Sequence, residues 1–207
     1  ALLSWNLNGY HSHFKDLKLL LVTYITLVIC LQERHLLPKH NLHHHGYISY
    51  CMDNMDNSRA HGGVAILVHE SVYSEEIIFN STLKAVSTRI ILPHLNFIVC
   101  SLYLPLGDKI SLTDLSGMIS ELPTHFIIVG DFNAHNSMCG STQTCQERKL
   151  LEQLMLADNL IILNTGEIMH VCMAMGIMSS IDLTLSSRSI APHLDWTVLS
   201  DLYGSDH

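Results

Sequence analysis

The chain has 207 residues, a length that one folded domain ordinarily accommodates. Apolar residues make up 48% of it and charged residues 14%, which leaves ample material for a buried core and excludes an intrinsically disordered chain. The formal net charge of −8 argues against strong autonomous binding to DNA, because Lys and Arg contacts to phosphate supply most of that affinity.

The first part of the chain predicts a strand, a helix and a second strand. Residues 2–6 form a short strand that stops before Asn8-Gly9, a dipeptide that favours turns. A helix capped by Ser12 follows, because apolar residues then recur at roughly helical spacing. Its inward stripe comprises Phe14, Leu17, Leu20 and Leu21. Residues 27–31 are a continuous run rich in β-branched side chains, which indicates a strand covered on both faces.

The middle of the chain, from Tyr47 to Pro105, predicts mostly antiparallel sheet. Its expected strands are residues 47–52, 63–68, 76–79, 85–92 and 96–104. A helix follows, with an apolar face formed by Leu115, Met118, Ile119 and Leu122. The next apolar strand, residues 126–129, ends at Gly130-Asp131.

The last part of the chain predicts a third helix over residues 146–158 and closing strands over residues 160–163, 181–185 and 196–199. Strands interleaved with a few helices indicate an α/β fold in which two mixed β-sheets lie face to face and helices flank them. We therefore expect a four-layer α/β sandwich that forms a single domain over residues 1–207.

The cysteines and the apolar runs bear on compartment and membrane. The six cysteines contain no CxxC pair, and Cys30, Cys100 and Cys172 lie in apolar or strand-like runs where reduced cysteines pack. This usage favours a reducing, intracellular compartment. The most membrane-like stretch, residues 19–31, is too short to span a bilayer, so we expect no membrane partner.

Polar side chains recur where the predicted apolar strands end. The set comprises Asn6, Glu33, Tyr103, Asp131, Asn133, Asp182, Asp206 and His207. Strand ends are where α/β proteins assemble functional sites. For any single residue the plain alternative, that loops are polar, is about as good an explanation. It explains the whole set poorly.

Six motifs occur in the order of a known family. They are Ser4-Trp5-Asn6-Leu7-Asn8-Gly9, Leu31-Gln32-Glu33, Ser101-Leu102-Tyr103-Leu104-Pro105, Gly130-Asp131-Phe132-Asn133-Ala134-His135, Ser180-Ile181-Asp182 and Ser205-Asp206-His207. The chain resembles the endonuclease/exonuclease/phosphatase family, which includes exonuclease III and apurinic endonucleases. Asn164-Thr165-Gly166 and Ile181-Asp182-Leu183-Thr184 are similar to the endonuclease domains of non-LTR retrotransposons.

The resemblance implies phosphodiester hydrolysis that depends on Mg²⁺, with Mn²⁺ as a substitute. This chemistry needs a hard cation, an oriented water and donors to the phosphate. The implied metal ligands are Glu33, Asn6 and Asp206, because Mg²⁺ prefers oxygen ligands and keeps several waters.

The remaining implied roles concern the water and the phosphate. Asp131 would orient and deprotonate the attacking water, while Asn133 and Tyr103 contact the phosphate. His207 would donate to the phosphate, and Asp182 would hold its imidazole in place. The implied substrate-binding residues are Asn8, Ser205 and Met169.

Several positions depart from the family pattern. Ile168-Met169 stand where Pro-Thr is common, which removes a hydroxyl donor. Arg34 stands where Thr is usual, and Cys139 where Trp-Gly is common. Together these changes suggest a drifting genomic copy. We also expect the chain to be a piece of a longer retrotransposon polyprotein. In the isolated piece His207, as the terminal residue, would be poorly anchored.

The leading hypothesis is a DNA endonuclease that acts in the nucleus. It would nick target DNA and leave a 3′-hydroxyl for a covalently linked reverse transcriptase. The alternatives are a related phosphatase or ribonuclease, which the lack of a basic cluster disfavours, and a degenerate copy without catalysis. The tract His43-His44-His45 has no second cluster at zinc-like spacing, and we interpret it as a loop.

Overall fold

The structure is a computed structural model of the chain. It describes residues 1–37, 40, 42–53, 61–78, 80–105, 111–123, 125–132, 153, 160–164, 170–172, 177–179 and 182–199.

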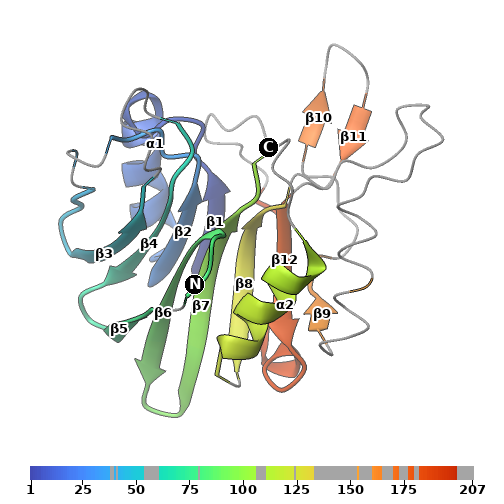
Figure 1. The fold of residues 1–207 in the computed structure, drawn as a ribbon. Coiled ribbons are helices and arrows are strands. Elements are labelled where there is room, and N and C mark those ends of the chain that lie inside the picture. The colour runs from blue at the N-terminus through green and yellow to red at the C-terminus, as the bar shows by residue number, and fades with distance from the viewer. Residues whose placement is uncertain are drawn as a thin grey trace.

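Two mixed sheets form the body of the protein (Figure 1). The first sheet has the order β1 (Leu2–Asn6), β2 (Val28–Gln32), β4 (Val64–His69) and β3 (Tyr47–Met52). The second has the order β5 (Tyr73–Ile77), β6 (Lys84–Leu92), β7 (Leu95–Tyr103), β8 (Phe126–Asp131), β12 (Asp182–Ser187) and β9 (Leu160–Ile162). The β1–β2 and β7–β8 pairs are parallel, and the other neighbouring pairs are antiparallel.

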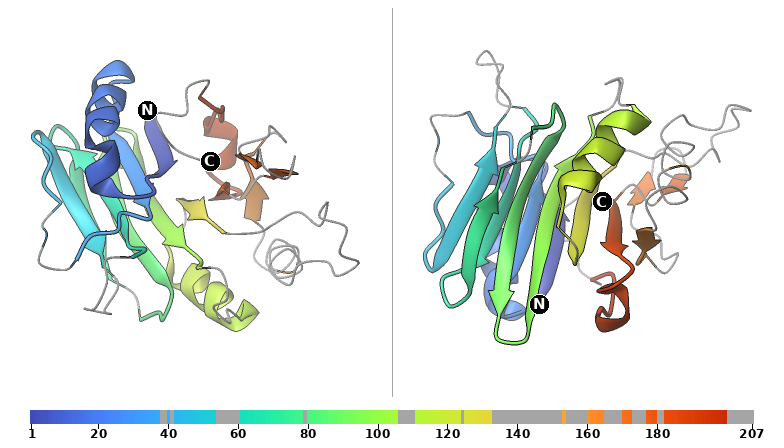
Figure 2. Two further views of the ribbon diagram at one scale, coloured as in Figure 1. Left: turned by 90° about the horizontal axis from the view of Figure 1, so that it is seen from above. Right: turned by 60° about the horizontal axis from the view of Figure 1, so that its bottom comes forward.

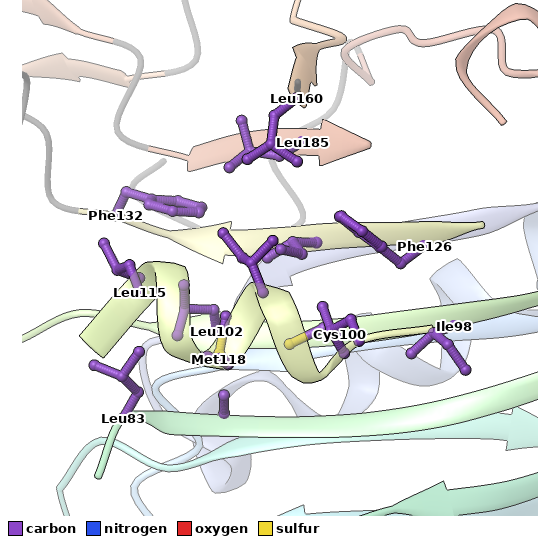
Figure 3. Close-up of a cluster of buried hydrophobic side chains, with 14 of the residues drawn as sticks. Leu83, Ile98, Cys100, Leu102, Leu115, Met118, Phe126, Phe132, Leu160 and Leu185 are labelled. Atoms are coloured by element: carbon purple, nitrogen blue, oxygen red, sulfur yellow. The ribbon is translucent and has the colours of Figure 1, made fainter. Parts of the chain in front are cut away.

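The two main helices cover opposite outer faces of the pair of sheets (Figure 2). Helix α1 (Tyr10–Thr23) packs in one hydrophobic cluster with β1, β2 and β4. Helix α2 (Leu112–Glu121) packs in another with β7 and β8, where Figure 3 shows Leu115 and Met118 close to Leu102 and Cys100. A third cluster fills the space between the sheets. The predicted four-layer α/β sandwich is therefore confirmed.

The local sequence explains which face of each helix is buried and where α2 begins. The predicted stripe of α2 is buried, and so are Leu17, Leu20 and Leu21 of α1, while Phe14 is partly buried and packs against the same cluster. At the start of α2, Ser111 Oγ accepts the Asp114 N–H at 3.1 Å and Asp114 Oδ2 accepts the Ser111 N–H at 3.1 Å. This reciprocal pair satisfies two amide groups that a helix end leaves open.

The start of α1 differs from the prediction. Gly9 rather than Ser12 precedes the helix, and no side chain caps it. The Tyr10 N–H donates instead to the Arg34 carbonyl at 2.9 Å. A side-chain cap is not needed at this position, because the segment after β2 accepts the first helical amide.

Most predicted strands occur within a few residues of their expected bounds. The strand predicted over residues 76–79 is displaced, because β5 spans Tyr73–Ile77 and its register is set by pairing with β6. The strand predicted over residues 196–199 is wrong. Trp196 lies in a segment without regular structure, and its Nε1 donates to Thr184 Oγ1 of β12 at 3.1 Å.

Three further elements complete the described structure. The hairpin of β10 (His170–Cys172) and β11 (Ile177–Ser179) was not predicted, and a single 3₁₀ turn, η1, spans Ala191–His193. The predicted helix over residues 146–158 lies outside the described residues apart from Gln153. No helix in the described ranges is long and apolar enough to cross a membrane.

Buried cysteines behave as core residues. Cys30 and Cys100 are fully buried. Burial raises the pKa of the Cys100 thiol to about 12, and burial together with the nearby Cys100 raises the pKa of Cys30 well above its usual range. Both thiols therefore stay protonated at neutral pH and pack as small apolar groups.

Candidate active site

Two carboxylates from different sheets meet at one end of the sandwich. Asn6 ends β1, Glu33 follows β2 and Asp131 ends β8. Asn6 Nδ2 donates to Glu33 Oε1 at 3.2 Å and to Asp131 Oδ2 at 3.1 Å. Asn6 is 2% exposed and Asp131 is fully buried, so both bonds form in a place largely closed to water.

The orientation of the Asn6 amide is fixed by the backbone that follows it. The Asn8 N–H donates to Asn6 Oδ1 at 3.1 Å, so the nitrogen of the amide faces the carboxylates. An ionised carboxylate can only accept hydrogen bonds, so the amide nitrogen is the group that can bond to both. Asn6 therefore acts in this arrangement as a donor that holds Glu33 and Asp131 together.

Glu33 has an uncommon backbone conformation. Its φ is +48° and that of His35 is +50°, a region that residues other than glycine seldom occupy. The turn is bonded on both sides, since Gly9 N–H donates to the Glu33 carbonyl at 2.9 Å and His35 N–H donates to the Gly62 carbonyl at 2.9 Å. Such strain persists where the surroundings over-determine it, and it is common at functional sites.

Tyr103 and Asp182 join the site through strand register. In the second sheet Tyr103 of β7 and Asp182 of β12 lie on either side of Asp131, each as its direct partner. The Leu104 N–H also donates to the Asp131 carbonyl at 2.9 Å. The Tyr103 ring lies against Gly62, where a Cβ would stand 3.3 Å from Cε1. The pairing of β7, β8 and β12 therefore places Tyr103, Asp131 and Asp182 side by side at one end of the second sheet.

Asn164 is a positioning residue that sequence reasoning did not assign. Its Nδ2 donates to the Asp182 carbonyl at 3.0 Å, and its Oδ1 accepts the Thr184 N–H at 2.7 Å. The side chain thus continues the sheet beyond β9 and fixes the start of β12. Its place in Asn164-Thr165-Gly166, one of the motifs that carry the resemblance, was the available signal.

His35 is a second residue without an assigned role. Its Nε2 lies 3.3 Å from Glu33 Oε2, the oxygen that Asn6 does not contact, and its side chain is 33% exposed. The Asn6 amide nitrogen and an imidazole nitrogen of His35 therefore face the two oxygens of Glu33. The positive φ of both residues brings them together, and spacing in the sequence does not reveal that conformation.

Arg34 shows that one departure from the family pattern is accommodated by the fold. The side chain is 1% exposed and forms an ion pair with Asp53 at the end of β3, while its Nη1 donates to Cys51 Sγ at 3.2 Å. A buried guanidinium needs such a partner. The Arg in this place therefore belongs to a local arrangement that also involves Cys51 and Asp53.

The donor set suits a hard divalent cation. Carboxylate oxygens are the protein ligands that Mg²⁺ prefers, and Glu33 and Asp131 present theirs side by side. Two like charges so close together are costly unless a donor or a cation offsets them. Among the described residues no group of three or more His, Cys, Asp and Glu side chains has metal-binding geometry. The described part of the chain thus supplies a partial ligand set.

Five predicted site residues lie outside the described residues. They are Asn133, Met169, Ser205, Asp206 and His207. Of the others, Asn6, Glu33 and Asp131 are joined by hydrogen bonds, Asn8 contacts Asn6 through its backbone, and Tyr103 and Asp182 flank Asp131. The tract 43–45 lies in the loop before β3, as predicted.

Comparison with known proteins gives matches to a family model and to individual relatives. A family model described as "Endonuclease-reverse transcriptase" matches residues 97–207, more than half of the chain. The "RNA-directed DNA polymerase from mobile element jockey" of Drosophila melanogaster is 25% identical over 169 residues. That match covers 79% of this chain, which spans only 18% of the length of the relative.

Solved structures share the fold at low sequence identity. The endonuclease domain of TRAS1, a telomere-specific non-LTR retrotransposon, is 18% identical with a TM-score of 0.79, and the match covers 100% of this chain and 94% of that one. The AP endonuclease LMAP from Leishmania major is 15% identical with a TM-score of 0.74, over 99% of this chain and 84% of that one.

Proposed function

The chain belongs to the endonuclease-reverse transcriptase family, and from that premise we propose that it is a Mg²⁺-dependent DNA endonuclease that nicks target DNA for retrotransposition. The observation that carries the proposal is the Asn6 amide, which joins Glu33 of the first sheet to Asp131 of the second at 3.2 and 3.1 Å. The relatives are named as RNA-directed DNA polymerases, which supports a covalently linked reverse transcriptase as partner. The proposed place of the reaction is the nucleus, where the target DNA lies.

In the proposed hydrolysis of a phosphodiester, separate residues hold the metal and activate the water. Glu33 and Asp206 would hold the metal, with Asn6 fixing the Glu33 carboxylate; Mn²⁺ would serve as a substitute. When bound, the metal neutralises charge that develops on the phosphate. Asp131 orients the attacking water and accepts its proton. Burial of Asp131 keeps bulk water away from that carboxylate, which favours a single bound water over exchange with solvent.

The other residues act on the phosphate and the strand. Tyr103, next to Asp131 in the sheet, contacts the phosphate together with Asn133. His207 donates to the phosphate, and Asp182 fixes its imidazole. Asn8, Ser205 and Met169 contact the substrate strand.

The test is conversion of supercoiled plasmid to the open-circular form in Mg²⁺. We expect nicking that EDTA abolishes and Mn²⁺ restores. Asp131→Asn should slow nicking by roughly 10²–10⁴-fold, the usual worth of a positioned acid–base group. The matched control is Asp114→Asn, an exposed carboxylate of the α2 cap, which should nick at the unsubstituted rate. Nicking that persists in chelator, or a fully active Asp131→Asn variant, would refute the mechanism.

The same assay separates the alternatives. A phosphatase would release inorganic phosphate from a 3′-phosphorylated oligonucleotide and leave plasmid intact. A ribonuclease would cleave an RNA oligonucleotide faster than its DNA counterpart. A degenerate copy would cleave neither substrate while remaining folded by circular dichroism.

A further inference from the structure

The interior between the two sheets changes from apolar to polar just beneath the carboxylates. Side chains of alternate residues in a strand share one face, and Val28 and Cys30 of β2 belong to the apolar cluster between the sheets. Gln32, the next residue on that face, is fully buried and directly precedes Glu33. A long amide thus occupies the last buried position of β2.

Gln32 bonds the first sheet to the second. Its Nε2 donates to Ser101 Oγ of β7 at 3.0 Å and to Ser4 Oγ of β1 at 3.4 Å. Ser101 lies two residues before Tyr103, which is the partner of Asp131 in the β7–β8 register. The bond therefore ties the strand that precedes Glu33 to the strand that places Asp131.

The other end of the Gln32 amide is not satisfied. Oε1 is buried and accepts no hydrogen bond within the described part of the chain. A buried carbonyl in this state costs stability, whereas an apolar side chain of the same length would fill the space without that cost. Stability of the fold alone therefore does not explain a glutamine here, while its two bonds beneath the carboxylates do.

We propose that Gln32 is a positioning residue for the metal centre, which fixes the distance between Glu33 and Asp131 by hydrogen-bonding β2 to β7. The inference rests on the proposed metal-dependent function. Asn6 joins the two carboxylates directly, whereas Gln32 joins β2, which precedes Glu33, to β7, the parallel neighbour of the strand that ends at Asp131. Without Gln32, the bond from β2 to Ser101 of β7 is lost while the Asn6 bonds remain, and the carboxylates are held less firmly.

The test measures Mn²⁺ binding to the DNA-free chain from the electron paramagnetic resonance signal of free Mn²⁺, beside the melting temperature without metal. Gln32→Met keeps the length of the side chain and removes the amide. We expect its Kd for Mn²⁺ to rise by roughly 10–100-fold, as for other groups that orient metal ligands, with the metal-free melting temperature unchanged or higher. Thr88→Val is the matched control, because Thr88 is fully buried and its hydroxyl bonds no described residue. Its Kd should stay unchanged.

A second variant covers the case in which Gln32→Met lowers stability by leaving Ser101 without its donor. Gln32→Met/Ser101→Ala removes both partners, a change that is often neutral for stability. A stable double variant that binds Mn²⁺ weakly supports the proposal, whereas one that binds like the unsubstituted chain overturns it. If the unsubstituted chain bound no Mn²⁺, the proposed metal centre itself would be lost, and the role of Gln32 with it.

Discussion

At the scale of single residues, the structure explains one departure from the family pattern, Arg34. Arg34 replaces a usual threonine and suggested decay when only the sequence was considered. In the fold the guanidinium is 1% exposed and paired with Asp53, so it is a buried charge with a partner. A buried ion pair adds little net stability, but removing one partner is costly because the other charge is left uncompensated.

The Arg34–Asp53 pair gives a stability prediction. Asp53→Asn should lower the free energy of unfolding by about 3 kcal/mol, the lower end of the usual cost, because the Asp53 side chain is 20% exposed. Urea unfolding measures the change. Glu75→Gln is the matched control, since its partner Arg89 and Glu75 are 38% and 41% exposed and the expected loss is below about 1 kcal/mol. Equal losses in both variants would mean that Arg34 does not depend on Asp53.

His44 gives a prediction on pH. Its ring packs edge-on against Phe14 and Tyr47, and burial, followed by Lys18, His43 and His45, lowers the pKa of His44 from its ordinary value of 6.5. The folded state then binds fewer protons than the unfolded state. Above pH 6.5 His44 is neutral in both states, and its contribution to the free energy of unfolding is complete. As the pH falls from 6.5 toward the lower pKa of the folded state, the unfolded state binds the proton first and this contribution is lost.

The measurement is the melting temperature of the chain and of His44→Gln between pH 7.5 and 5.5. The unsubstituted chain should become less stable as the pH falls, because the unfolded state binds the His44 proton more readily than the folded state. The decline should be smaller in His44→Gln, which cannot gain the proton. A decline of the same size in the two proteins would show that His44 is protonated equally in the folded and unfolded states.

At the scale of elements, the site depends on how closely β7 and β8 approach. Leu102 and Gly130 are direct partners in this parallel pair, and a Cβ built on Gly130 would stand 1.8 Å from the Leu102 carbonyl oxygen. A backbone atom cannot be displaced cheaply. The glycine therefore allows the pairing that brings Tyr103 beside Asp131 one residue later.

Gly130→Ala should force the two strands apart. We expect a loss of about 3 kcal/mol or more in the free energy of unfolding, at the upper end of overpacking costs. At roughly 2–4 °C per kcal/mol for a chain of this size, the melting temperature should fall by about 6 °C or more. Gly117→Ala in α2 is the control of opposite sign, because no atom lies within 4 Å of its added Cβ. It should gain about 0.4–1 kcal/mol.

At the scale of the whole molecule, the fold forms a candidate site for a nucleic acid, whereas the net charge of the chain opposes binding of one. The sandwich gathers carboxylates at one end, while the net charge of −8 repels a polyanion. A nuclease of this kind can meet its substrate only through local contacts or with the help of linked domains. The proposed linkage to a reverse transcriptase would supply that additional binding.

The isolated chain should therefore bind DNA weakly. We expect a Kd for a duplex oligonucleotide at or above the non-specific range of about 10⁻⁶–10⁻⁴ M at physiological salt, measured by fluorescence anisotropy in EDTA. Lowering the salt should tighten binding only modestly, because few cationic contacts release counterions. A nanomolar Kd would mean that the chain carries a cationic DNA-binding surface despite its overall charge.

The sequence by itself determined what depends on local pattern. Helix stripes and most strands follow from apolar spacing, and the positions of Asn6, Glu33 and Asp131 follow from where those strands end. Only the tertiary structure decided which side chains meet. Asn6 and Asp131 are 125 residues apart, and Gln32 and Ser101 are 69 apart. Such bonds depend on how two sheets stack, and so does the positive φ of Glu33, which its distant neighbours stabilise. The local spacing of residues predicts neither these bonds nor the φ of Glu33, because both are stabilised by contacts between segments far apart in the chain.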